Sequence, residues 1–181
     1  METMKKVLLV LIALMNTNLV CGAETMPELE TVAQVDITRY MGTWYEIAKL
    51  PNWFEKDLVG VTANYTLLPN GKVQVVNAGY MNTFDGKRKV AKGKAYVADK
   101  TTNAKLKVTF FWPFYGDYWI LELGKEYKYA VVGDNSRKYL WILARTPQMD
   151  EVQYTEIVAR ISAKGFDVTK LEKNPQKLDT P

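Results

Sequence analysis

The sequence predicts an all-β fold: an eight-stranded antiparallel up-and-down β-barrel with one C-terminal α-helix packed on its outside. Short runs rich in β-branched and aromatic residues alternate with turn residues at roughly ten-residue spacing, which is typical of antiparallel barrels and sandwiches. No segment between these runs has the length of a βαβ crossover, so a parallel sheet is excluded. Near the C-terminus the hydrophobic period changes to that of a helix.

The first residues, 1–23, predict a targeting segment. Two lysines precede an apolar run of about nine residues, which is too short to span a bilayer as a helix. Two interpretations of its end remain open. A signal peptidase could cut after Ala23, or residues 18–21 could act as a bacterial lipobox in which Cys21 becomes lipidated. Val20 departs from the small residue that a lipobox has before its cysteine.

After a polar tether at residues 24–35, the segment 36–172 is expected to form the barrel and its helix, and 173–181 a tail. A single helical turn at 36–40 would plug one barrel end. Turn residues separate eight predicted strands, at 43–50, 59–68, 72–80, 87–98, 104–111, 117–123, 127–133 and 138–145.

The one predicted helix follows the last strand. Its apolar residues recur at helical spacing between Asp150 and Gly165. Acidic residues at its start, and a lysine and a glycine at its end, favour a helix of about thirteen residues. Its single apolar stripe has to pack on the outside of the sheet.

Two distant segments are expected to meet at one end of this barrel. Gly42 and Trp44 open the first strand, and Arg145 ends the last. In an up-and-down barrel these positions lie at the same rim, so Arg145 can cover the Trp44 indole as a cation–π pair. The sequence therefore predicts that this end is closed and that the opposite rim is the mouth.

Alternation of side chains assigns an inner face to several strands, because charged residues have to face water. Most inward residues are aliphatic or aromatic, and Asn77 is one of the few polar ones. Such a lining suits a small-molecule pocket, although a barrel filled by its own side chains remains the alternative. The candidate ligand-binding residues are Tyr65, Val75, Asn77, Val108, Trp119, Leu121, Tyr129 and Trp141.

The predicted mouth carries the loops 51–57, 82–89, 112–115 and 133–138. Two of them are rich in aromatic residues, and Lys87, Arg88 and Lys89 lie beside them. An apolar mouth next to cations suits an amphiphile whose anionic head stays outside. Ordinary loop packing and a solvated start of a strand are the alternative interpretations.

Composition excludes several function classes. The chain has no histidine, which removes the commonest general base and transition-metal ligand, and a single cysteine, which excludes an intrachain disulfide. Its net charge of +4 and pI near 9.0 are weak indications of nucleic-acid binding, since no basic block is interleaved with aromatics. No cofactor, metal or nucleic-acid partner is expected.

At these residues the chain resembles the lipocalin family, and specifically the bacterial outer-membrane lipocalins, with apolipoprotein D as the similar animal type. The resemblance covers about 36–172. The segments that carry it include 40–48, with Gly42-Thr43-Trp44-Tyr45, the run 108–116, and 140–147, with Ala144-Arg145-Thr146-Pro147. The imperfect lipobox departs from the bacterial pattern.

The resemblance implies an eight-stranded barrel that binds lipids. For the bacterial group it implies that the ligands are lysophospholipids or fatty acids, which are stored or transported for membrane maintenance. It also implies an outer-membrane anchor through Cys21 and is compatible with a homodimer. By matching strand position it also assigns Tyr65, Asn77, Trp119 and Trp141 to the pocket.

An enzyme on the same scaffold, of the isomerase or de-epoxidase type, is the alternative function. It would need an inward-facing acid or base, and Glu46 shares the alternation of Trp44. A satisfied polar group near the barrel floor is the other interpretation of Glu46. Haem transport is disfavoured because no histidine can bind the iron.

Overall fold

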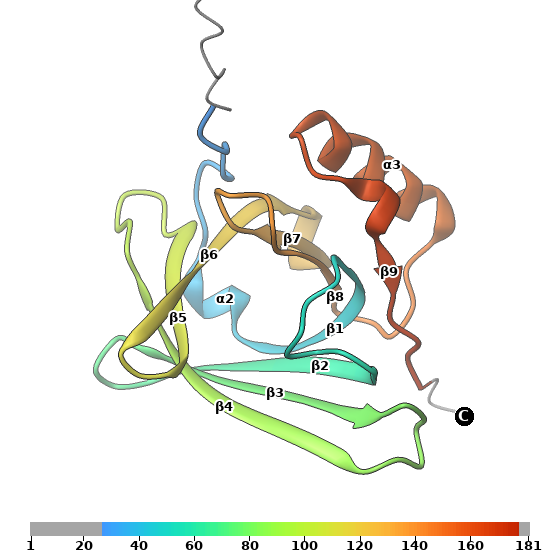
Figure 1. Ribbon diagram of the computed structural model, residues 1–181. Helices are drawn as coiled ribbons and strands as arrows, with labels where there is room; N and C mark the ends of the chain where they lie inside the picture. Colours follow the sequence, from blue (N-terminus) through green and yellow to red (C-terminus); the bar gives the residue numbers. More distant parts are fainter. Residues whose placement is uncertain (1–26, 178–181) are drawn as a thin grey trace, which may run out of the picture.

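The computed structural model describes residues 27–177, in which eight strands close into one antiparallel barrel (Figure 1). Each strand pairs with the next one along the chain, and β1 pairs with both β2 and β8, which closes the cylinder. The strands are β1 (Gly42–Lys49), β2 (Leu58–Leu67), β3 (Val73–Met81), β4 (Arg88–Val97), β5 (Lys105–Phe111), β6 (Phe114–Leu123), β7 (Tyr129–Gly133) and β8 (Leu140–Ala144). The predicted fold class is confirmed.

The predicted strand ends lie close to those of the structure, except at β6. That strand begins at Phe114, because Phe111 and Phe114 pair directly and leave only Trp112 and Pro113 in the turn. At the other end of β6, the short 3-10 helix η1 (Lys125–Tyr127) replaces the predicted start of the next strand.

Two α-helices accompany the barrel, and Figure 1 shows α2 at the end of the cylinder and α3 outside it. In α2 (Ile37–Tyr40), the side chain of Asp36 accepts hydrogen bonds from the first amides of the turn. In α3 (Glu151–Ala163), Asp150 accepts one from the amide of Gln153. Both helices therefore begin at an aspartate N-cap, which satisfies amides that lack a partner in the helix.

The apolar residues form an inner and an outer core. The inner core fills the end of the barrel next to α2, around Tyr40 and Trp44. Along the strands, its residues alternate with those of the outer core. The outer core lies between the barrel wall and α3, where Ile157 and Ile161 are fully buried. Each of β7 and β8 serves both cores, which explains why these short strands are apolar along their whole length.

Four strand pairs contain a register shift, and two of these shifts bear on the facing of the candidate residues. In β6 the register shifts between Ile120 and Glu122, and in β1 between Glu46 and Ala48. A bulge puts two consecutive residues against one partner, so alternation is interrupted there. In β6 this leaves Ile120 in the inner core, whereas Leu121 contributes to the outer one.

The described part of the expected tether, residues 27–35, packs on the barrel. Leu29 and Val35 are buried, and the amides of Val32 and Val35 donate to the carbonyls of Ile120 and Thr102. Although the segment is polar overall, it contains three apolar residues at spacings of three: Leu29 joins the outer core, and Val32 and Val35 join the inner core.

The beginning of the expected tail is also part of the barrel wall. After the 3-10 turn η2 (Val168–Lys170), the short strand β9 (Glu172–Lys173) pairs with the second half of β1. Strands β1 and β2 pair with each other only along Gly42–Tyr45, and beyond this point the C-terminal segment bridges them. Among residues 27–177, no helix is long and apolar enough to cross a membrane.

Candidate ligand-binding cup

The end of the barrel at Trp44 is closed by Arg145. Its guanidinium lies 3.7 Å from the centre of the Trp44 ring, and it donates hydrogen bonds to the backbone carbonyls of Arg39, Tyr40 and Thr43. The Trp44 indole N–H also donates to the carbonyl of Tyr40. The predicted contact between the two motifs is present. It links α2 to the start of β1 and to the end of β8. Gly42 adopts a φ of 94°, and a Cβ there would lie 3.4 Å from the guanidinium.

Three tyrosines form the floor above this seal. The hydroxyl of Tyr118 lies 2.8 Å from that of Tyr40 and 2.9 Å from that of Tyr65. Burial raises the pKa of all three phenols above its ordinary value, so they stay neutral. Two hydrogen bonds among three hydroxyls leave one O–H free, and this group can donate to a ligand or a water molecule.

The upper half of the interior is reached by solvent. Trp44, Val73 and Ile120 at the bottom are at most 1% exposed. Towards the mouth, the side chains that alternation directs inward are only half-buried, as in Asn77, Val108 and Trp141. In a closed barrel such side chains can meet water only from inside. The barrel is therefore filled at its floor and accessible above it, which is the shape of a cup.

Five of the eight candidate ligand residues face this cup. Tyr65 and Val75 are opposite each other in the inner core, and Asn77 pairs with the inward Ala63. Val108 and Trp141 pack against the same core from β5 and β8. The side-chain oxygen of Asn77 is buried without a hydrogen-bond partner in the described structure, so this inward position offers one unused acceptor.

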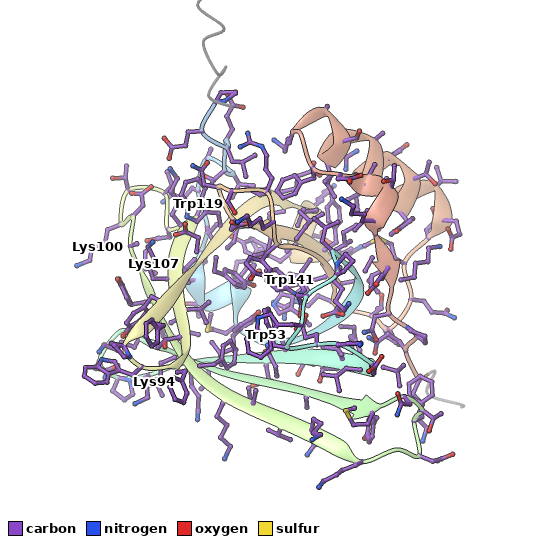
Figure 2. The ribbon with its side chains drawn as sticks, viewed as in Figure 1. Trp53, Lys94, Lys100, Lys107, Trp119 and Trp141 are labelled. Carbon is purple, nitrogen blue, oxygen red and sulfur yellow. The ribbon has the colours of Figure 1, made fainter. Side chains whose placement is uncertain are left out.

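The other three candidates, Trp119, Leu121 and Tyr129, lie outside the barrel, and the prediction of their facing was wrong. The orientation of Trp119 and Leu121 was inferred by alternation from Glu122, which does face out. The register of β6 shifts between Ile120 and Glu122, so alternation does not continue across this point. Trp119 instead has the Lys105 ammonium 4.1 Å from its ring centre, and Leu121 packs under α3. In Figure 2, Trp119 lies at the outer side of β6, whereas Trp141 lies near the middle of the opening.

Tyr129 was misassigned for a different reason. Strand β7 is apolar on both faces, so no charged residue marks its outer side. The register pairs Ala130 with the inward Leu143, which turns Tyr129 outward, where its hydroxyl accepts a hydrogen bond from Arg160 of α3.

The loop between β1 and β2 is fastened across part of the mouth. The Glu55 carboxylate accepts hydrogen bonds from the Trp141 indole at 2.9 Å and from the side chain of Asn52 at 2.7 Å. Phe54 packs on Tyr139 and Trp141, whose rings are stacked on each other. No local sequence pattern marks Glu55 as part of the site, because its partner Trp141 lies 86 residues away.

Glu46 is 2% exposed and bonded to the C-terminal segment, where its carboxylate accepts a hydrogen bond from the Asn174 side chain at 3.0 Å. Burial and the neighbouring Glu55 raise its pKa well above the ordinary value, and Lys49 opposes this. These contacts make Glu46 a buried structural carboxyl in the barrel wall. No group of three or more His, Cys, Asp or Glu side chains within residues 27–177 could hold a metal ion.

Two clefts of about 370 and 450 Å³ lie along the C-terminal segment. Their walls include Asn174 and Pro175, and none of the eight candidate ligand residues lines them. They are open surface depressions beside the seam between β1 and β2, and the cup is a separate feature.

A closed floor, an apolar wall and an accessible mouth give this barrel the kind of interior in which eight-stranded barrels can hold one small apolar molecule. A model of the lipocalin-like domain matches residues 35–176, which is nearly all of the described chain. The chain belongs to the lipocalin family, and its relatives imply ligand binding.

Relatives from bacteria, plants and animals are similar over most of their length. Temperature-induced lipocalin-1 of Arabidopsis thaliana is 45% identical over 163 residues, covering 85% of this chain and 86% of the relative. The outer membrane lipoprotein Blc of Escherichia coli K12 is 44% identical over 151 residues, with 83% and 85% covered. Apolipoprotein D of Mus musculus is 33% identical over 150 residues, with 78% and 77% covered.

Among solved structures, insecticyanin from the tobacco hornworm Manduca sexta superimposes with a TM-score of 0.66 at 22% identity, covering 84% of this chain and 87% of that one. At this identity the likeness supports the fold alone.

Proposed function

We propose that the protein binds a single-chain lipid, a lysophospholipid or fatty acid, in the cup and stores or transports it in the cell envelope for membrane maintenance. The half-burial of inward-facing side chains above a sealed floor is the observation that carries this proposal. Tyr65, Val75, Asn77, Val108 and Trp141 are its proposed contacts.

The apolar wall supplies the affinity. Each buried methylene of an acyl chain contributes about 0.8 kcal/mol, from which association and chain ordering subtract a large part. Chain length should therefore dominate affinity. An eight-stranded barrel is just wide enough for one small ligand, so a two-chain phospholipid should fit poorly.

Charges at the mouth favour binding with the acyl chain inside and the headgroup at the rim. Glu55 is buried at the mouth beside Trp141, where its carboxylate would repel an anionic head that entered. At the rim, Lys89 pairs with Gly79 and shares the alternation of the inward Ala91, whereas the neighbouring Arg88 points out of the barrel. We therefore propose Lys89 as the cation that meets the phosphate or carboxylate.

The test is a titration of intrinsic tryptophan fluorescence with lysophospholipids of increasing chain length, below micelle-forming concentrations. Trp141 lies in the cup and Trp119 outside it, so Trp141→Phe should remove most of the response and Trp119→Phe should leave it. A response that is independent of chain length, or that is lost in both variants alike, would contradict binding in the cup.

The headgroup is tested with the same signal. Lys89→Ala should weaken fatty acid binding several-fold, and Arg88→Ala, which removes an equal charge on the outer face, is the matched control. Equal effects of the two variants would mean that the rim acts only through its overall charge.

The proposed location is the outer membrane, with the chain anchored through lipidated Cys21; a soluble periplasmic or secreted protein after cleavage at Ala23 is the alternative. The name of the Escherichia coli relative as an outer membrane lipoprotein supports the first. Cys21 and Ala23 lie outside the described residues.

A further inference from the structure

The hairpin of β5 and β6 ends in an exposed aromatic tip. Phe111, Trp112 and Phe114 are 77%, 78% and 73% exposed. Leaving three large aromatic side chains in water forfeits the hydrophobic free energy that each would gain on burial. Contiguous exposed apolar groups of this kind mark an interaction site.

These side chains serve neither the cup nor its floor. The neighbouring Phe110 packs towards the interior, because a Cβ on the inward-facing Gly93 would come within 2.9 Å of its ring. Phe111 and Phe114 pair at the end of the hairpin, with Trp112 and Pro113 in the turn between them. Behind them, Tyr96 and Tyr115 stack edge to face at 5.5 Å, which supports the base of the tip from the outer face of the barrel.

Two exposed lysines on β4 flank the tip. Lys94 pairs with Thr109 of β5, and Lys92 lies two residues further in the direction of the hairpin turn. Within residues 27–177 no carboxylate forms an ion pair with either, whereas Lys107 on β5 is paired with Asp117 at 2.7 Å. Figure 2 shows Lys94 beside the β5–β6 turn. The lysines nearest the tip are thus free to meet an external anion.

We propose that this hairpin face, formed by Phe111, Trp112, Phe114, Tyr115, Lys92 and Lys94, docks on the surface of an anionic lipid bilayer. Aromatic side chains favour the level of the lipid headgroups, and lysines beside them are attracted to anionic lipid. The tip is an exposed two-residue hairpin turn, and lysine is depleted in protein–protein interfaces, so a membrane fits this face better than a protein partner does.

Docking would orient the cup. The β5–β6 turn belongs to the same rim as the β1–β2 loop at the mouth, so insertion of the tip brings the mouth to the membrane surface. An acyl chain could then pass between bilayer and cup with little exposure to water. The proposal does not depend on the identity of the ligand.

The experiment uses the full chain bound to vesicles whose lipids carry bromine on their acyl chains, which quenches tryptophans that enter the bilayer. The Trp112 contribution is obtained by comparison with Trp112→Phe. On vesicles containing phosphatidylserine, Trp112 should be quenched, and Phe111→Ser/Phe114→Ser should abolish the quenching. Because every arm retains the N-terminal segment, attachment by that segment alone leaves Trp112 unquenched and overturns the proposal.

The charge component has its own control. Lys92→Ala/Lys94→Ala should raise the lipid concentration for half-maximal Trp112 quenching by about thirty-fold at low salt. Lys100→Ala/Lys125→Ala removes the same charge at the closed end and should leave it unchanged. Equal quenching on pure phosphatidylcholine would overturn the role of anionic lipid.

A tip variant that changes only the oligomeric state would identify the face as an interface between copies of the chain. Unchanged ligand titrations in all variants would separate these outcomes from a failure of the cup.

Discussion

At the scale of single residues, Arg145 is the residue on which the closed end depends most. Its side chain joins the backbone of α2, the start of β1 and the Trp44 ring. A partly buried cation over an indole contributes about 1–2 kcal/mol, and hydrogen bonds from a charged donor contribute comparably.

We therefore expect Arg145→Ala to lower the free energy of unfolding by about 2–3 kcal/mol, and the melting temperature by roughly 5–10 °C. Ligand affinity should stay within a few-fold, because Arg145 lies below the floor of the cup. Thermal unfolding followed by circular dichroism measures the first effect, with the exposed Arg88→Ala as control. An unchanged melting curve with lost binding would reverse the assignment of closed and open ends.

Glu46 predicts a dependence of stability on pH. Its pKa is raised by burial above the ordinary value of 4.5. As pH rises from that value through the raised pKa, the unfolded chain loses a proton that the folded chain keeps, so the free energy of unfolding falls. Glu46→Gln retains an acceptor for Asn174 and should remove this part of the fall.

The measurement is urea denaturation of wild type and Glu46→Gln from mildly acidic to mildly alkaline pH. The variant should gain stability relative to wild type as pH increases. Glu156→Gln on the exposed face of α3 is the control. If the wild-type and Glu46→Gln curves remain parallel, ionisation of Glu46 is not linked to folding.

At the scale of elements, the segment after β9 completes the barrel where β1 and β2 separate. The Asn174 side chain donates to the carbonyl of Leu58 and to Glu46, and accepts from the amide of Val61. Gln176 likewise donates to the carbonyls of Glu46 and Val61. Side chains of the C-terminal segment thus take the place of strand pairing.

Asn174→Ala should reduce the free energy of unfolding by about 2–4 kcal/mol, because it leaves several buried polar groups without partners. Hydrogen exchange should accelerate selectively at Gly60 and Val61. Lys177→Ala, an exposed change three residues on, should be neutral. Faster exchange spread evenly over all strands would instead mean that the segment stabilises the barrel as a whole.

At the scale of the whole molecule, the proposed docking of the hairpin face and the proposed lipidation of Cys21 would make two independent contacts with a membrane. If Cys21 is lipidated, its acyl chains supply stable attachment, since more than one chain is needed for this. Cys21→Ser should then move the protein from the membrane to the soluble fraction of its host, as followed by fractionation and mass measurement of the N-terminus. A wild-type protein that begins at Glu24 and is soluble would establish the cut after Ala23.

The sequence by itself determined the barrel, its closed end and the order of its strands. These follow from local signals: turn residues at regular spacing, the change of period at α3, and two motifs whose strand positions bring Trp44 and Arg145 together. It also predicted the inward facing of Tyr65 and Trp141, because polar or charged neighbours mark the outer side of their strands, and that of Asn77, which shares one face with Val73 and Val75.

Only the tertiary structure decided the facing of Trp119, Leu121 and Tyr129 and the roles of Glu55 and Asn174. Alternation is a local rule, and a bulge in β6 interrupts it without a sequence signal that we recognised. In β7 both faces are buried, one by the inner core and one by α3, so hydrophobicity cannot distinguish them. Glu55 and Asn174 bond to residues distant in the chain, and such contacts exist only once the barrel has closed.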